Sequence, residues 1–125
     1  MSLIWKTEIT DIGPEVADLA EGGVVIFFAT GAPPELAEVS VLHRQSMLAS
    51  EAPSIGAKIR IGGIEAAITA IGDKAWDKVR EIGHVVVNFN GEPATIRPGE
   101  ICASVVEGAD LVAALVVGAE IAVIA

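Results

Sequence analysis

The chain has few side chains that can react near neutral pH, and two of them are its only histidines, His43 and His84. Histidine is the side chain whose unperturbed pKa allows its charge to change between about pH 5 and 8, and one nitrogen of the neutral ring carries a lone pair. Cys102 is the single cysteine, which excludes a disulfide framework and a Cys-x-x-Cys site within this sequence. The candidate chemistry of the chain therefore rests on the two imidazole rings.

His43 lies in the stretch "VLHRQSML", which continues a predicted strand over residues 39–45. Side chains alternate along a strand, so Val39, Val41, His43 and Gln45 share one face. A lone histidine beside two valines is more often a packed, half-buried ring than a catalyst, and spacing alone favours that structural role. Gln45 is the best-placed local neighbour for any group attached to His43, so the reactive role stays open.

His84 begins a second predicted strand, over residues 84–90. It shares a face with Val86, Asn88 and Asn90, and this polar face indicates solvent or a site. The opposite face carries Val85, Val87 and Phe89. The alternative is a strand-entry histidine that bonds a carbonyl at the end of the preceding helix.

Motifs for other chemistries are absent from the sequence. The glycines lack the spacing of a phosphate-binding loop, and neither a nucleophile elbow nor a paired-carboxylate motif occurs. The histidines and Cys102 lack the spacing of metal ligands, and "GEICASVV" reads as a strand in which Cys102 is a small core residue. The sequence therefore predicts neither a metal nor a cofactor.

Composition and charge narrow the class of protein. Hydrophobic residues make up 52% of the chain, Val and Ile are abundant, and 13 glycines and 6 prolines suggest many tight turns. The net charge of -9 disfavours nucleic acid as a partner. No basic, apolar leader begins the sequence, and the final apolar stretch is shorter than the roughly 20 residues of a spanning helix. We expect a cytoplasmic protein without membrane insertion, whose β-prone final segment admits a homodimer formed by edge pairing.

The patterns predict an all-β protein, residues 1–125 forming one domain. The expected fold is a small closed or partly open β-barrel of about nine short strands with one short helix at about residues 73–83. In that helix Asp73 is the expected N-cap and Gly83 the C-terminal glycine. A hairpin over residues 56–72 turns at Gly62-Gly63, and "TIRPGEICASVV" is a late strand.

Two segments carry a family resemblance: "GAPPELAEVSVLHRQSML" and "IGAKIRIGGIEAAITAIGDKAWDKVREIGHVVVNFNG". They resemble the glucitol/sorbitol-specific enzyme IIA of the bacterial phosphotransferase system. The resemblance implies that the chain folds as a small barrel. It also implies that the chain is a phosphotransferase component, which accepts a phosphoryl group on His43 from the histidine-containing phosphocarrier protein. It also implies that the group passes to the IIB domain of the IIB/IIC sorbitol permease, which selects the sugar alcohol.

One position departs from that pattern. Family relatives can carry a second histidine two residues after the first, and this chain has Gln45 there. His84 matches a recurrent family position, so Gln45 and His84 are candidate supporting residues. The departure leaves open a non-catalytic binding or regulatory module on the same barrel. A small-ligand barrel of the lipocalin type is a third alternative.

Overall fold

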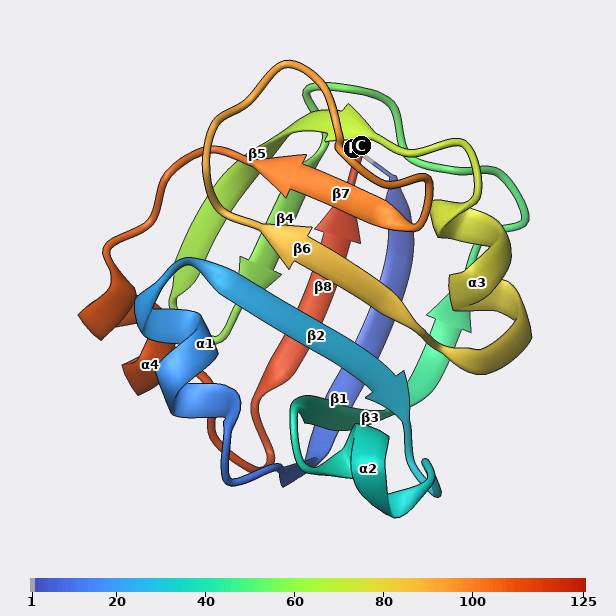
Figure 1. The fold of residues 1–125 in the computed structure, drawn as a ribbon. Coiled ribbons are helices and arrows are strands. Elements are labelled where there is room, and N and C mark those ends of the chain that lie inside the picture. Colours follow the sequence, from blue (N-terminus) through green and yellow to red (C-terminus); the bar gives the residue numbers. More distant parts are fainter. Residues whose placement is uncertain (1) are drawn as a thin grey trace.

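Eight strands and four helices make up the computed structural model, which describes residues 2–125 (Figure 1). In chain order the elements are β1 (Leu3–Ile12), α1 (Val16–Glu21), β2 (Val24–Ala29), α2 (Pro34–Ala37), β3 (Ser40–Leu48), β4 (Lys58–Ile61), β5 (Ile64–Ile71), α3 (Ala75–Ile82), β6 (Val85–Asn88), β7 (Glu100–Ala103), α4 (Gly108–Ala114) and β8 (Glu120–Ile124).

The strands close into a barrel in the order β1-β3-β2-β6-β7-β5-β4-β8, which confirms the predicted fold class. Two neighbouring pairs, β2–β3 and β6–β7, run parallel, and the other pairs are antiparallel. The first and last strands pair with each other, so Leu3 of β1 lies beside Ile124 of β8 (Figure 1). Within residues 2–125 each of the eight strands has two neighbours, so the closed barrel leaves no strand edge for the edge-paired homodimer that the sequence admits.

Alternating side chains fill the barrel interior. In β1 the inward residues are Trp5, Thr7 and Ile9. In β6 they are Val85 and Val87, and Phe89 just after β6 is buried too, so these three residues form the apolar face that the sequence pattern predicts. The predicted hairpin is present, with β4 and β5 joined at Gly62-Gly63. Cys102 is buried, as expected of a core residue.

The prediction of one helix is wrong, because α1, α2 and α4 are additional short helices outside the barrel wall. The predicted late strand also begins too early, since β7 starts at Glu100. Pro98 lies just before it and has no N–H for a strand ladder. Among residues 2–125, every helix falls short of the length and apolarity that a membrane crossing requires.

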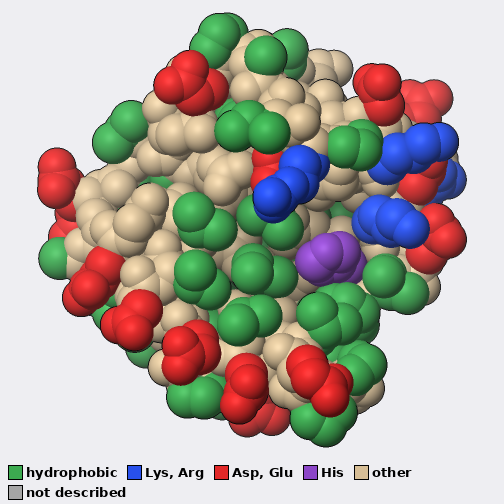
Figure 2. Space-filling model, in the orientation of Figure 1, with side chains coloured by type: hydrophobic (Ala, Val, Ile, Leu, Met, Phe, Trp, Pro, Cys, Tyr) green, Lys and Arg blue, Asp and Glu red, His purple; other side chains and the backbone are tan. Residues whose placement is uncertain are grey.

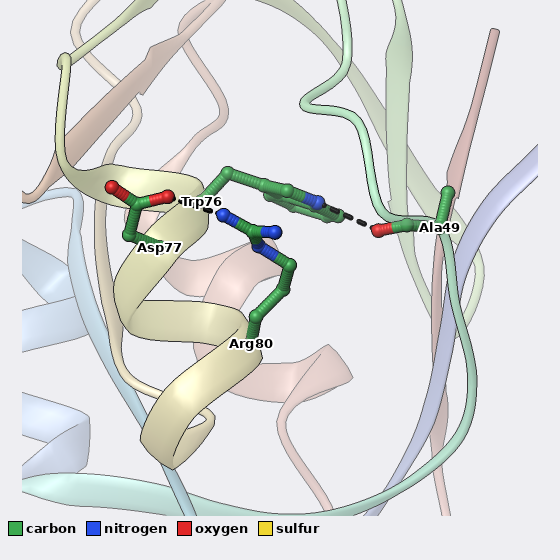
Figure 3. A network of polar contacts seen from close by, with 4 residues as sticks. All are labelled: Ala49, Trp76, Asp77 and Arg80. Carbon is green, nitrogen blue, oxygen red and sulfur yellow. Dashed lines mark hydrogen bonds and ion pairs between the residues drawn. The ribbon is translucent and has the colours of Figure 1, made fainter.

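α3 is the helix that the sequence predicts best, and it borders the candidate site. It begins at Ala75 with Lys74 as its N-cap, so the assignment of Asp73 is wrong. Gly83 ends the helix in the left-handed region at φ 64°, as predicted. Figure 3 shows how α3 is tied to the barrel: Trp76 Nε1 donates to the carbonyl of Ala49, at 2.9 Å.

Candidate functional site

His43 points into the barrel from the middle of β3. Its side chain is 1% exposed. The ring of Trp5 lies edge-on at 5.3 Å between centroids, and the ring of Phe27 lies at 6.2 Å. The spacing of residues in β3 predicts a packed ring for His43, and the burial of His43 agrees with that prediction.

Both ring nitrogens of His43 have hydrogen-bond partners. Nε2 lies 2.7 Å from the carbonyl oxygen of Gly83, and Nδ1 lies 2.7 Å from the hydroxyl of Thr7. A carbonyl can only accept, so Nε2 carries the proton of the neutral ring and Nδ1 accepts from the Thr7 hydroxyl. Burial lowers the pKa of His43, and the hydrogen bond to Gly83 opposes this by a smaller amount. The ring is therefore neutral at pH 7.

Local irregularities of the β1–β3 pairing surround His43. Residue Ile9 lies opposite His43, and Thr7 lies opposite Gln45. The register shifts on both sides of this stretch, between Lys6 and Thr7 and after Ile9. Such bulges bend a strand and re-aim its side chains, and they are frequent next to active sites.

The backbone of His43 is also fixed by the end of β2. Thr30 donates to the His43 carbonyl from its backbone N–H at 3.0 Å and from its hydroxyl at 3.1 Å. The hydroxyl groups of Thr30 and Thr10 lie 2.6 Å apart. The position of the ring is therefore set by three strands, β1, β2 and β3.

Gln45 does not bond to His43 in this structure. Its Oε1 atom accepts a hydrogen bond of 2.7 Å from Trp5 Nε1. Because Trp5 also packs edge-on against His43, the indole ring lies between Gln45 and the histidine. The structure thus brings Gln45 to the edge of the site, one residue removed from the imidazole.

His84 lies at the surface beside the buried ring. Its Nδ1 atom donates to the carbonyl of Phe27 at 3.1 Å, and its backbone N–H donates to the carbonyl of Lys78 in α3 at 3.3 Å. The contact with a helix carbonyl, which the sequence offers as the alternative, is therefore made by the backbone and not by the ring. The ring of Phe28 lies 5.2 Å away. Figure 2 shows a histidine side chain at the surface of the molecule, between apolar side chains and a group of Lys and Arg side chains.

The two histidines meet at one peptide group rather than ring to ring. The carbonyl that accepts from His43 Nε2 belongs to the peptide bond between Gly83 and His84. Phe27 touches both histidines, since its ring packs on His43 and its carbonyl accepts from His84. A shift of the turn at Gly83 therefore changes the surroundings of both rings.

A groove of about 340 Å³ lies beside β1 and β3. It is lined by Lys6, Thr7, Glu8, Arg44, Gln45, Ser46, Gly118 and Glu120. The Ser46 hydroxyl donates to the Lys6 carbonyl there, at 3.2 Å. Within residues 2–125 the acidic, Cys and His side chains form no group that could hold a metal ion.

Sequence reasoning missed three neighbours of His43: Thr7, Trp5 and Gly83. Thr7 carried a usable signal, because a hydroxyl on the inward, otherwise apolar face of the first strand needs a polar partner. Gly83 was recognised as a helix end, but its carbonyl contact with His43 depends on how α3 lies against the barrel.

Comparisons with known proteins agree with the resemblance. The sequence model of the family "PTS system glucitol/sorbitol-specific IIA component" matches residues 4–122. Two proteins named "PTS system glucitol/sorbitol-specific EIIA component", from Shigella flexneri and Escherichia coli (strain K12), are each 34% identical over 101 residues, 81% of either chain.

A solved structure resembles the fold. It is described as a PTS system IIA component from Enterococcus faecalis V583, with a TM-score of 0.78, 17% identity, and coverage of 96% of this chain and 99% of that chain. At that identity the match supports the barrel alone. The family model and the relatives at 34% identity show that the chain belongs to the glucitol/sorbitol-specific IIA components of the phosphotransferase system.

Proposed function

We propose that this chain is a phosphoryl carrier that accepts a phosphoryl group on His43 from the histidine-containing phosphocarrier protein. It then passes the group to the IIB domain of a glucitol/sorbitol permease, which phosphorylates the sugar alcohol. The carrier works in the cytoplasm as a transferase component. The proposal rests on the neutral imidazole of His43, whose two nitrogens are hydrogen-bonded to Thr7 and Gly83, in a chain of this family.

Phosphoryl transfer to His43 requires few groups besides the imidazole ring. A neutral imidazole nitrogen is a nucleophile, and the protein has to hold one tautomer and steady the phosphate oxygens. The half-exposed ring of His84 is the nearest candidate for that second task, because the backbone N–H groups of Gly83 and His84 already donate to the carbonyls of Val79 and Lys78. No step requires a nucleotide or a metal.

The resting structure is closed around His43. Because the ring is 1% exposed and its Nε2 proton is donated to Gly83, transfer requires the turn at Gly83 to move aside. This enclosure also favours the second candidate function, a binding or regulatory module that has lost phosphotransfer. The filled barrel interior disfavours a small-ligand barrel of the lipocalin type.

Labelling separates the two functions. The chain is incubated with phosphoenolpyruvate, enzyme I and the phosphocarrier protein, and the acid-labile label is mapped. We expect label on His43, none in His43→Gln, and slower labelling, still on His43, in His84→Gln. A wild-type chain that takes no label supports the regulatory module. Label that is lost only in His84→Gln assigns the acceptor to His84.

A further inference from the structure

The two partners of His43 differ in what they can do. The Gly83 carbonyl can only accept a hydrogen bond, whereas the Thr7 hydroxyl can donate or accept. The resting ring uses Thr7 as a donor to Nδ1, because Gly83 holds the single ring proton on Nε2. Thr7 is buried, so no water can readily replace it at Nδ1.

The two partners also differ in whether they can move. Thr7 lies within β1 and pairs with Gln45 of β3 and with Ile121 of β8, so its departure would break the closed barrel. Gly83 lies in a turn between α3 and β6. The nitrogen that a phosphoryl group can reach is therefore Nε2, on the side of the turn.

We propose that Thr7 is a positioning residue for phosphoryl transfer, whose hydroxyl changes from hydrogen-bond donor to acceptor when the His43 proton moves from Nε2 to Nδ1. This role rests on the proposed function. Once the Gly83 carbonyl has left, the ring with its proton on Nδ1 has a free lone pair on Nε2. Nδ1–H then donates to the Thr7 oxygen that previously donated to it.

The transfer step balances without a further reactant. The His43 Nε2 lone pair attacks phosphorus, the new N–P bond forms, and the N–P bond of the donor phosphohistidine breaks. The electron pair of that bond returns to the donor ring, which leaves as a neutral imidazole with its other nitrogen protonated. The positive charge of the donor ring passes to the His43 ring, where Nδ1 keeps its proton.

Thr7 contributes more to the phosphorylated ring than to the resting ring. A hydrogen bond from a cationic ring is charge-assisted and stronger than one to a neutral ring. An interaction that strengthens as charge develops lowers the barrier rather than only stabilising the ground state. Trp5, edge-on to the ring, keeps water away from this bond.

The test compares Thr7→Val with Thr7→Ser. Valine keeps the volume and the branched shape but removes the hydroxyl, and serine keeps the hydroxyl. We expect valine to slow labelling of His43 by about tenfold to a hundredfold, and serine to restore it to within about threefold. The unfolding midpoint in urea confirms that each variant is folded.

A pH profile adds a readout that a packing role would not move. The protonated ring donates from both nitrogens, so loss of the Thr7 acceptor disfavours the cation. We expect the acid limb of the labelling rate to lie at lower pH in Thr7→Val than in wild type and in Thr7→Ser. Equal rates and an unchanged acid limb in Thr7→Val, or a serine variant as slow as the valine variant, overturn the role of Thr7.

Nitrogen-15 spectra of the histidine rings make the test independent of whether Thr7→Val folds. We expect the proton of wild-type His43 on Nε2 at rest and on Nδ1 after phosphorylation. A phosphorylated ring without a proton on Nδ1 at pH 7 overturns the proposal. A wild-type chain that takes no label overturns the proposed function and this role with it, whereas fast labelling of Thr7→Val overturns the role of Thr7 alone.

Discussion

His43 donates its Nε2 proton to the carbonyl oxygen of Gly83 across 2.7 Å, and this bond joins the interior of the barrel to the end of α3. Its acceptor belongs to a residue held in the left-handed region. The position of α3 therefore determines the position of the carbonyl group that holds the imidazole. The stability of the resting protein depends on this turn, and the proposed transfer requires the turn to move.

Gly83→Ala should destabilise the protein by about 1 to 2 kcal/mol. An alanine there is strained at φ 64°, and its Cβ would lie 2.9 Å from the Ala29 side chain and 3.2 Å from His43 Cε1. Urea unfolding measures the change. Gly56→Ala is the matched control, since Gly56 also has a positive φ, 98°, and a Cβ there meets nothing within 4 Å. Equal effects of the two substitutions would contradict the close packing at Gly83.

The stability of the wild-type protein should fall as the pH drops below 6.5. Burial lowers the pKa of folded His43 from its ordinary value of 6.5, so in this range the unfolded chain binds the proton more readily than the folded one. Protonation then pulls the equilibrium toward unfolding, by at most about 1.4 kcal/mol per pH unit.

The control for this pH dependence is His43→Gln, whose amide does not titrate. The difference in unfolding free energy between wild type and variant, measured from pH 7 to pH 5, cancels the carboxylates common to both. The wild type should lose stability relative to the variant across that range. A constant difference would show that the pKa of His43 is the same in both states.

Trp5 and Gln45 should be energetically coupled. The bond from Trp5 Nε1 to Gln45 Oε1 is part-buried and 2.7 Å long, and a coupling of about 0.5 to 1.5 kcal/mol is expected. A double-mutant cycle of Trp5→Phe and Gln45→Ala in urea measures it. Additive effects of the two substitutions would mean that Gln45 does not restrain the indole ring against His43.

Trp76→Phe should loosen α3 more than Asp77→Ala does. The first removes the hydrogen bond between Trp76 and the Ala49 carbonyl, at an expected loss of about 1 kcal/mol. The second removes the exposed ion pair with Arg80, whose expected contribution is within about 0.5 kcal/mol (Figure 3). Amide exchange of α3 and urea unfolding report both effects. A larger loss in Asp77→Ala would contradict this order.

The sequence predicts the strands well where one face is apolar and the other polar. The inward set Val85, Val87 and Phe89 follows from the two-residue period of a strand, and Gly83 follows from the glycine preference at helix ends. Helix starts are harder, because α3 begins without a side-chain cap. Asp73 looked like a cap only by residue type.

The environment of His43 could be predicted only in part. Alternation along β3 places His43 and Gln45 on one face, and in the structure both contact Trp5, although His43 is buried and Gln45 only half-buried. The contacts of the ring depend on pairings between distant segments: Thr7 is 36 residues away along the chain and Gly83 is 40 away. Bulges in the β1–β3 pairing set that register, and local propensity does not encode them.

The pairing of β8 with both β1 and β4 has a consequence for synthesis of the protein on the ribosome. Until β8 emerges, β1 and β4 each expose a row of unpaired backbone groups, and such edges invite pairing with other chains. The nascent chain therefore passes through an open sheet whose closure waits for its last strand. Aggregation during expression should depend on how long translation keeps that sheet open.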